Sequence, residues 1–333
     1  MSFHVAIVGA TGAVGQEFLT VLAQRKFPIK SLRLLASPRS TGKRIEFGGA
    51  THTVQELTKN SFKDIQFAFF SAGGSISKEF APAAVSAGAL VIDNTSAFRM
   101  KEGIPLVVPE VNPEQIKRHN GLIANPNCST IIMNVPVWPL HKANRVKRII
   151  VSTYQAVSGA GAWGLYELEA QMKQSAGGLA IEKEKFPHVI VNNLFSHNTK
   201  IAPNGYNEEE NKMVNETRKI FGDPRIMVAA TCVRVPVPRA HSESINLEFE
   251  RPMTETQVRE ILSKAPGVKL VDDRERNHFP MPLEASGQDD VLVGRIRQDI
   301  SREDGRGIEM FVSGDQIRKG AATNAVQIAE LLI

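Results

Sequence analysis

The stretch Phe3–Gly15, FHVAIVGATGAVG, decides the fold of the first part of the chain. Its first six residues, Phe3–Val8, are mainly apolar and have the length of a buried strand. Three glycines follow at intervals of three, and a helical repeat of apolar side chains comes after them. A strand, a glycine turn and a helix in this order are typical of a dinucleotide-binding unit. The spacing is G-x-x-G-x-x-G, however, and a plain strand-to-helix turn is the alternative. The cofactor contacts that we expect from this turn are Gly9, Thr11, Gly12, Ala13 and Val14.

The segment after the second strand candidate, Leu32–Ala36, favours NADP over NAD. An NAD site usually has an acidic residue about 20 residues after the glycines, to bind the ribose hydroxyls. None is present here, and residues 37–44 read SPRSTGKR. Arginine can bind a phosphate with two parallel hydrogen bonds, and serine can donate a third. We therefore expect Ser37, Arg39 and Ser40 to contact the cofactor, with a solvated basic loop as the alternative.

Strands and helices alternate through the first 127 residues. Further strand candidates lie at 65–70, 90–93, 106–108 and 122–124, and a helix is expected at 78–87. This alternation predicts a doubly wound, Rossmann-like parallel sheet, in which ligands bind beyond the carboxyl ends of the strands. Several turns fall at that edge and are expected to meet at one crevice: Gly9, Ser37, Ser71, Asn94 and Cys128.

The chemically most informative residue is Cys128, in the motif NPNCST at 125–130. Pro126 disfavours helix at the residue before it, and Asn127 can cap a helix that starts here. A thiol at a helix N-terminus lies near free N–H groups and the positive end of the helix dipole, which favour the nucleophilic thiolate. The alternative is a small buried hydrophobic residue.

The second half of the chain is rich in strand candidates without regular crossover helices. These lie at 146–155, 226–235, 244–250, 290–296 and 308–314, with a helix at 163–174 and an irregular segment at 178–206. The pattern predicts an α+β domain with a mixed sheet, for substrate binding and dimerisation. A last helix at 315–333 is expected to pack on the first domain. The expected domains are therefore 1–127 with 315–333, and 128–314.

Composition excludes several classes of protein. Two cysteines, Cys128 and Cys232, cannot form a disulfide framework and have no metal-ligand spacing, so we expect no metal and a cytoplasmic protein. No apolar run approaches the roughly 20 residues that span a bilayer. The net charge of +5 suits small anionic ligands, but scattered basic residues and 6% aromatic residues argue against nucleic acid.

Eight motifs in order carry a family resemblance: GATGAVG, SPRSTGK, NTSAFR, NPNCST, YQAVSGAG, EENK, RVPVPRAH and GDQIRKGAATNA. Together they resemble aspartate-β-semialdehyde dehydrogenases, over essentially the whole chain. The resemblance implies a homodimeric enzyme that reduces β-aspartyl phosphate with NADPH to aspartate semialdehyde and phosphate, through a cysteine thioester. This reaction serves lysine, threonine and methionine synthesis. The segment from Gly178 to Tyr206 resembles the shorter bacterial type.

The resemblance also implies residue roles. Cys128 matches the nucleophile, His241 the acid/base histidine and Gln155 the residue that orients the substrate carbonyl. Arg99 and Lys212 match phosphate contacts, while Arg234 matches the α-carboxylate clamp and Glu209 the carboxylate near the amino group. The cofactor contacts that it implies in addition to those above are Ser71, Ser158, Gly159, Gly161 and Gln316.

Several alternatives stay open at this point. N-acetyl-γ-glutamyl-phosphate reductase uses the same chemistry, although Glu209 suits a free ammonium that an acetylated substrate lacks. A non-catalytic nucleotide-binding relative is a second possibility. Individually, Glu209 and Lys212 could form only a surface pair, Arg234 could pair with an acid of the protein, and Arg99 could be a solvated loop residue.

Overall fold

The computed structural model describes residues 2–333. The chain forms two compact units, one of residues 1–127 and 321–333, the other of residues 128–320. Residues 315–320, which we expected in the first domain with the last helix, therefore group with the second unit. Each unit is described by itself below.

The first unit is built on a six-stranded parallel sheet with the order β5-β2-β1-β6-β7-β8. The strands are β1 (Phe3–Val8), β2 (Ile29–Ala36), β5 (Gln55–Glu56), β6 (Phe67–Phe70), β7 (Leu90–Asp93) and β8 (Leu122–Ala124). The strand order reverses between β1 and β6, so the turns after these two strands flank a topological switch point. The predicted doubly wound sheet is confirmed.

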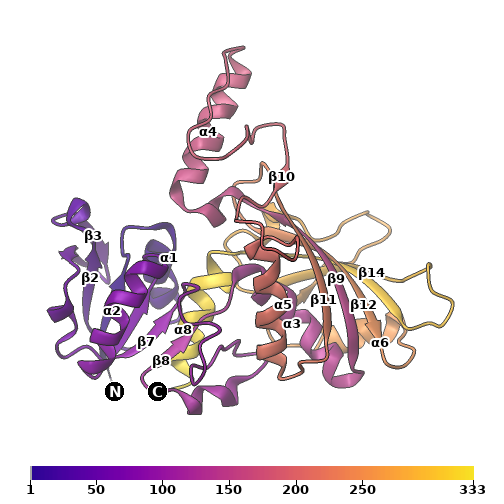
Figure 1. Ribbon diagram of the computed structural model, residues 1–333, viewed down its shortest axis with the longest axis horizontal. Coiled ribbons are helices and arrows are strands. Elements are labelled where there is room, and N and C mark those ends of the chain that lie inside the picture. Colours follow the sequence, from indigo (N-terminus) through magenta and orange to yellow (C-terminus); the bar gives the residue numbers. More distant parts are fainter. Residues whose placement is uncertain (1) are drawn as a thin grey trace. The chain divides into compact units, whose positions relative to one another are not determined.

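Both faces of this sheet are buried, because β1 alternates between two cores. Val5 and Ile7 pack in the core that contains α1 (Ala13–Gln24) and α8 (Thr323–Glu330), whereas Ala6 and Val8 pack in the core of α2 (Gly74–Ser86). This burial on both sides explains why the strand is a continuous apolar run. Figure 1 shows α1, α2 and α8 beside the strands of the unit.

The glycine turn after β1 has no space for side chains. A Cβ atom on Gly9 would lie 2.5 Å from the backbone oxygen of Ser71, and one on Gly15 would overlap the backbone oxygen of Gly9. Gly9 also has a φ of +88°, which L side chains rarely adopt. These glycines therefore allow the strand-to-helix turn to lie directly against the loop that follows β6.

The second unit has a seven-stranded mixed sheet with the order β10-β11-β9-β12-β15-β14-β13. The strands are β9 (Val146–Gln155), β10 (Phe195–Ser196), β11 (Met227–Arg234), β12 (His241–Phe249), β13 (Val268–Leu270), β14 (Val291–Gln298) and β15 (Gly307–Gly314). On one face lie α3 (Cys128–Ala143), α5 (Glu208–Phe221) and α6 (Glu255–Leu262), which Figure 1 shows against the strands. The predicted mixed sheet is confirmed.

The opposite face of this sheet carries exposed apolar side chains. Along β9, Ile149 and Val151 are buried, whereas Ile150 and Tyr154 on the other face are exposed. Tyr154 packs against the ring of Phe311 on β15, and Met227 on β11 is also exposed. An alternating strand that exposes large apolar residues indicates a surface that can be covered by a partner.

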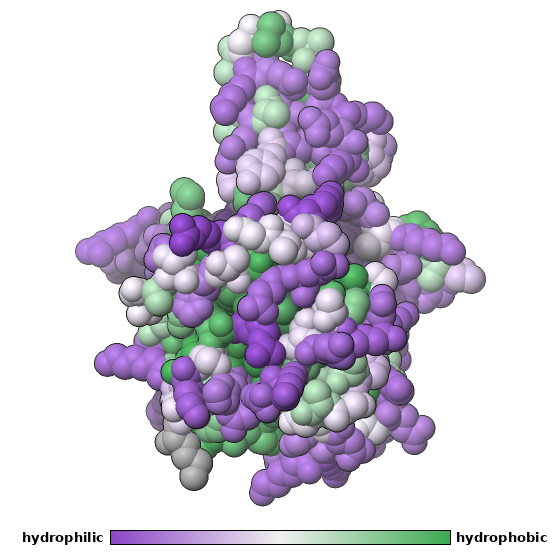
Figure 2. Space-filling model, turned by 90° about the vertical axis from the view of Figure 1, so that its left-hand side faces the viewer, coloured by the Kyte–Doolittle hydropathy of each residue, from purple (hydrophilic) through white to green (hydrophobic). Residues whose placement is uncertain are grey.

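The segment after α4 (Ala162–Ala176) is tied to that helix by two buried polar side chains. The carboxylate of Glu167 accepts the backbone N–H groups of residues 184–186, and Oε1 of Gln171 accepts those of Ile190 and Val191. Figure 1 shows that α4 and this segment form a projection. Figure 2 shows that the surface of this projection is mainly hydrophilic, with a hydrophobic patch near its tip. The segment that we expected to be irregular has little regular structure but is fixed by these contacts.

The remaining elements are short. They are η1 (Pro38–Ser40), β3 (Arg44–Phe47), β4 (Ala50–Thr53), η2 (Lys59–Phe62), η3 (Pro113–Arg118), η4 (Val157–Ala160) and α7 (Pro282–Ala285). Among residues 2–333, no helix is long and apolar enough to cross a membrane.

Three sequence predictions of local structure are wrong. The strand expected at 106–108 is a buried segment with a single bridge, from Leu106 to Ala124. The helix α2 begins at Gly74, four residues before its predicted start. The last helix does not begin at Asp315, because the carboxylate of Asp315 accepts the N–H groups of Ile317 and Arg318 and so ends the extended chain. A π-helical turn, η5 (Arg318–Ala322), comes before α8.

Candidate active site

Cys128 is the first residue of α3 and is partly buried. Its Sγ atom lies 3.5 Å from Nε2 of His241, the first residue of β12. The π-helical turn packs closely beside it, since a Cβ atom on Gly320 would lie 2.8 Å from Cβ of Cys128. A cysteine that begins a helix, contacts an imidazole and remains partly accessible is arranged as a nucleophile and not as a core residue.

The hydrogen bonds of His241 define its tautomer. The backbone N–H of Ala156 donates to Nδ1 at 3.0 Å, so the ring proton of the neutral imidazole is on Nε2, which points toward Cys128. Burial holds the pKa of His241 well below its usual value, and the nearby guanidinium of Arg234 lowers it further. His241 is therefore a neutral Nε2–H donor to the sulfur.

Three strand ends bring the polar side chains of the site together. Gln155 ends β9, Arg234 ends β11 directly opposite it in the parallel register, and His241 begins β12. All three side chains are buried on the sheet face that the helices cover. A polar residue in a strand often faces water, but Gln155 is buried.

Arg234 is only 2% exposed and is held by uncharged groups. Its Nη1 donates to the backbone oxygen of Ala156 at 2.6 Å, and its Nη2 donates to Nε2 of His197 at 2.7 Å. Nε is buried and has no partner among residues 2–333. Among residues 2–333, no acidic side chain forms an ion pair with this guanidinium, although Glu209 interacts with it electrostatically. A buried guanidinium without an ion pair can bind an anionic ligand.

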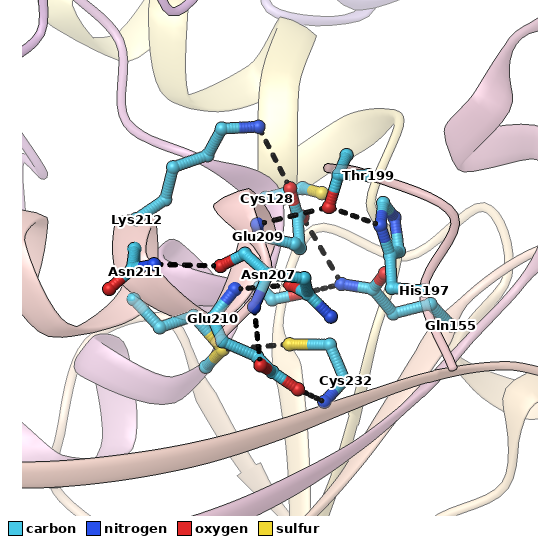
Figure 3. Close-up of polar contacts among 12 residues, drawn as sticks. Cys128, Gln155, His197, Thr199, Asn207, Glu209, Glu210, Asn211, Lys212 and Cys232 are labelled. Atoms are coloured by element: carbon cyan, nitrogen blue, oxygen red, sulfur yellow. Dashed lines mark hydrogen bonds and ion pairs between the residues drawn. The ribbon is translucent and has the colours of Figure 1, made fainter. Parts of the chain in front are cut away.

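Glu209 connects the first turn of α5 to the strand ends. Asn207 caps this helix, and its side chain accepts the N–H of Glu210. Lys212 Nζ lies 3.0 Å from Oε2 of Glu209, and Nε2 of Gln155 donates to Oε1 at 3.3 Å. Figure 3 shows these side chains together with Cys128 and His197. The expected i,i+3 pair is present, but Glu209 is only 5% exposed, so the pair is not a surface feature.

Gln155 has a second contact that could not be expected from the sequence. Its Nε2 donates to Oγ of Ser129, the residue after the cysteine, at 2.5 Å. Its Oε1 is buried and has no partner among the described residues. An amide fixed by its nitrogen therefore leaves an unsatisfied oxygen in the site, which a ligand can satisfy.

The first unit contains a cavity of about 480 Å³ at its switch point. Polar or glycine residues of three loops line it: Gly9, Thr11, Gly12, Ser37, Arg39 and Ser71. Ser40 lies beside it, with its Oγ 3.3 Å from that of Thr11. Ala13 and Val14 form the first turn of α1 and do not line the cavity. Close-approach glycines, hydroxyl groups and one guanidinium fit a phosphorylated dinucleotide.

Arg99 also belongs to the first unit, and it is buried. Its Nε donates to the backbone oxygen of Asn125 and its Nη2 to that of Asn94. The alternative of a solvated loop residue is therefore wrong.

Four residues that the resemblance assigned to the cofactor lie in the second unit near His241. They are Ser158, Gly159, Gly161 and Gln316. Oγ of Ser158 donates to the oxygen of Pro238, and Gln316 donates to Ser158 while accepting the N–H of Ala240. A Cβ atom on Gly159 would lie 3.0 Å from the imidazole of His241, and Gly161 has a φ of +95°. These residues hold the turn that carries Ala156 close to the imidazole.

His197 and Thr199 were not expected in the site. They lie in the segment 178–206, where neither motif nor periodicity indicates a role. His197 reaches Arg234 because β10 pairs with the end of β11, which is a long-range contact without a local sequence signal. Cys232, by contrast, is fully buried beside Met213 and is a core cysteine, and burial raises the pKa of its thiol.

Comparison with known proteins gives full-length matches. Residues 4–119 match the family model of the semialdehyde dehydrogenase NAD binding domain, and residues 137–319 match that of the semialdehyde dehydrogenase dimerisation domain. The chain is 55% identical to aspartate-semialdehyde dehydrogenase from Synechocystis sp., covering 99% of this chain and 97% of that protein. It is 53% identical to the enzyme of that name from Aquifex aeolicus, covering 100% and 98%.

Solved structures agree. The crystal structure of aspartate semialdehyde dehydrogenase II complexed with ASA from Vibrio cholerae has a TM-score of 0.97 and 48% identity, covering 100% of this chain and 98% of that one. A structure of the Candida albicans enzyme with NADP has a TM-score of 0.77 and 25% identity, covering 100% and 98%. With matches of this identity over its whole length, the chain is a member of the aspartate-semialdehyde dehydrogenase family of enzymes.

Proposed function

We propose that this protein catalyses the NADPH-dependent reductive dephosphorylation of L-β-aspartyl phosphate to L-aspartate 4-semialdehyde, through a thioester on Cys128. The observation that carries the proposal is the pairing of Cys128 Sγ with Nε2 of His241, 3.5 Å apart, beside the buried guanidinium of Arg234, which donates to two uncharged acceptors. Family membership supports the same reaction. The product belongs to amino-acid biosynthesis.

Cys128 acts as the nucleophile. Its thiolate attacks the acyl carbon, the bond from that carbon to the phosphate oxygen breaks, and phosphate leaves, so that one difficult reduction becomes two easier steps. The start of α3 places the positive end of the helix dipole at the sulfur. After reduction of the thioester, the carbon–sulfur bond breaks and the sulfur returns to the thiolate.

His241 acts as a neutral hydrogen-bond donor. With Nδ1 occupied by the Ala156 N–H, the proton on Nε2 faces the sulfur and stabilises negative charge there or on the neighbouring oxygen of the intermediate. Gln155, whose amide oxygen lacks a partner, orients the acyl group.

Arg234 and Glu209 recognise the aspartyl part of the substrate. A guanidinium held by two uncharged acceptors keeps its charge for the planar α-carboxylate. The carboxylate of Glu209 suits the ammonium group, which an N-acetylated substrate does not have. We assign Arg99 and Lys212 to the phosphate group.

The cofactor is NADPH, held by the cavity of the first unit. Gly9, Thr11 and Gly12 would hold the pyrophosphate with their backbone, and Arg39 with Ser37 and Ser40 would bind the 2′-phosphate. We also assign Ser158, Gly159, Gly161 and Gln316 to the cofactor. When bound, the cofactor supplies the hydride for the thioester carbon.

The active form is a homodimer. The match to a dimerisation domain supports this assembly, and the exposed apolar sheet face with Ile150, Tyr154 and Met227 offers an interface for a second copy. Two free cysteines, one of them nucleophilic, suit the reducing cytoplasm.

An assay in the oxidative direction tests the proposal. The purified protein is incubated with NADP, phosphate and L-aspartate 4-semialdehyde, and NADPH formation is followed. We expect phosphate-dependent turnover with this aldehyde and little with N-acetylglutamate semialdehyde. Turnover of the acetylated aldehyde alone would contradict the proposal.

A further inference from the structure

We infer that His197 is a positioning residue, which holds Arg234 in the orientation that binds the substrate's α-carboxylate. The inference rests on the proposed role of Arg234. The imidazole Nε2 of His197 accepts a hydrogen bond from Nη2 of Arg234 at 2.7 Å, and the second terminal nitrogen, Nη1, donates to the backbone oxygen of Ala156. The guanidinium is thus fixed at both terminal nitrogens.

The two groups that accept hydrogen bonds from Arg234 are uncharged, which affects how strongly this arginine attracts an anionic ligand. An arginine held by a carboxylate loses much of its attraction for a second anion, because the two charges compensate. A carbonyl oxygen and an imidazole nitrogen orient the guanidinium without forming an ion pair with it. Glu209 is the acidic side chain that interacts electrostatically with its charge. The buried Nε of Arg234, without a partner among residues 2–333, shows that donor capacity remains for a ligand.

Thr199 fixes the imidazole in the tautomer that this contact requires. Because Nε2 accepts from Arg234, the ring proton is on Nδ1, which donates to Oγ1 of Thr199 at 3.2 Å. The same oxygen accepts the backbone N–H of Glu209 at 3.3 Å. Figure 3 shows His197, Thr199 and Glu209 in contact. One short chain of hydrogen bonds therefore connects the carboxylate clamp, Arg234, with Glu209, which we assign to the ammonium group.

The backbone brings His197 to this place independently of the imidazole. Phe195 of β10 pairs with Arg234 in the antiparallel register, and the N–H of His197 donates to the backbone oxygen of Cys232 at 2.8 Å. Substitution of the side chain leaves these two backbone contacts possible. The side chain can therefore be tested without removing the strand pairing that supports the segment.

The charged and titratable groups around His197 keep it neutral. Burial lowers the pKa of His197 to about 4, Glu209 opposes this shift, and Arg234 and Lys212 add to it. His241 is the other imidazole that interacts with it electrostatically. A protonated His197 would place a cation against the guanidinium and could no longer accept its N–H.

Two substitutions separate positioning from structure. His197→Asn places an amide near the position of Nδ1 and leaves Nη2 of Arg234 without its acceptor. His197→Gln carries an amide oxygen to the position of Nε2 and restores the acceptor. In the oxidative assay we expect His197→Asn to raise the KM for aspartate semialdehyde by about 10- to 100-fold, with kcat changed by less than about 3-fold. His197→Gln should recover most of this loss, and the KM values for phosphate and NADP should not change in either variant.

A substrate without the carboxylate gives the decisive comparison. 3-Aminopropanal has the aldehyde and the ammonium group of the substrate but no α-carboxylate, so its kcat/KM should be the same in wild type and in His197→Asn. His188→Asn, an exposed histidine of the same segment, is the matched control and should behave like wild type. An unchanged KM in His197→Asn, or an equal loss with both aldehydes, would overturn the inference.

The outcomes distinguish this inference from the proposed function. A wild-type protein that does not oxidise aspartate semialdehyde would overturn the proposed function itself, whereas an active wild type with an unaffected His197→Asn overturns only the role of His197. If His197→Asn does not fold, Thr199→Val, which removes the acceptor for Nδ1–H, is used in its place. We expect a smaller rise in the same KM, and its absence would also overturn the inference.

Discussion

Nε2 of His241 lies 3.5 Å from the sulfur of Cys128, and this nitrogen carries the ring proton. The backbone N–H of Ala156 donates to the other ring nitrogen, which excludes a proton there unless this hydrogen bond breaks. The pair therefore differs from one in which a histidine base takes the thiol proton. It is arranged to donate a hydrogen bond to the sulfur.

The first prediction concerns the tautomer of His241. Nitrogen-15 NMR of the histidine-labelled protein should show a neutral ring with the proton on Nε2 between pH 6 and pH 9, because burial and Arg234 keep the pKa of His241 well below its ordinary value. The signal is assigned by its loss in His241→Gln. A ring protonated on Nδ1, or an imidazolium at pH 7, would contradict the assigned donor role.

The second prediction concerns the close packing beside the nucleophile. In Gly320→Ala the new methyl group would lie 2.8 Å from Cβ of Cys128, so either the π-helical turn or the start of α3 must move. A shift of this kind misplaces the sulfur, and we expect kcat to fall by about 10- to 100-fold. The rate of alkylation by iodoacetamide should change as well. Wild-type values for both quantities would show that the contact is unimportant.

The third prediction concerns the cofactor. Arg39→Ala should weaken NADPH binding by about 10- to 100-fold and NADH binding by much less, because only NADPH has the 2′-phosphate that the guanidinium binds. Dissociation constants are measured by fluorescence titration. Arg44→Ala is the control, since it removes the same charge from the same segment outside the cavity. An equal loss for both cofactors would remove the argument for NADP.

The fourth prediction concerns Glu243, on β12 in the sheet of the second unit. It is fully buried on β12, neither carboxylate oxygen has a hydrogen-bond partner among the described residues, and burial raises its pKa well above the ordinary value of 4.5. Above pH 4.5 the unfolded chain loses this proton while the folded protein keeps it, so this group makes the free energy of unfolding fall as pH rises.

Glu243→Gln removes this titration but keeps the shape of the side chain. Its free energy of unfolding, measured by urea denaturation, should exceed that of wild type by about 1–3 kcal/mol at pH 8, and the difference should shrink toward pH 4.5. Glu248→Gln is the control, because that carboxylate lies on the same strand but forms ion pairs with Lys147 and Arg302. A difference that does not depend on pH would contradict a neutral Glu243.

The fifth prediction concerns the dimer. Ile150→Glu places a charge in the exposed apolar face of the seven-stranded sheet, where burial against a second copy would cost several kcal/mol. We expect a monomer by size-exclusion chromatography with light scattering. Ile300→Glu, at a residue that is 98% exposed outside this face, should remain a dimer. A dimeric Ile150→Glu would exclude this face as the interface.

Local patterns were sufficient to predict most of the fold. The apolar run of β1 and the glycines after it predicted the strand, the turn and the helix, since each depends on neighbours in the sequence. The segment at 106–108 was mistaken for a strand because buried apolar residues look alike whether or not they pair. The start of α8 was misplaced because the π-helical turn and the cap made by Asp315 have no periodic signal.

Residues of the site could be predicted from the sequence only where they belong to a recognisable motif. Cys128 and His241 stand in recognisable motifs, and the structure brings them into contact. His197 lies outside these motifs, and the motif that contains Ser129 does not indicate its partner. Their contacts depend on the pairing between β10 and β11 and on the position of Gln155 at the end of β9. Contacts of this kind between distant segments depend on tertiary structure and have no local signal in a single sequence.

The most direct test of the central claim is to trap the acyl group on the protein. The enzyme is mixed rapidly with NADP and aspartate 4-semialdehyde in the absence of phosphate, then quenched in acid and mapped by mass spectrometry. We predict a burst of about one NADPH per active site and an aspartyl group on the peptide that contains Cys128, with neither in Cys128→Ala. Steady turnover by Cys128→Ala, or a burst in the wild type without an adduct on Cys128, would contradict the thioester mechanism.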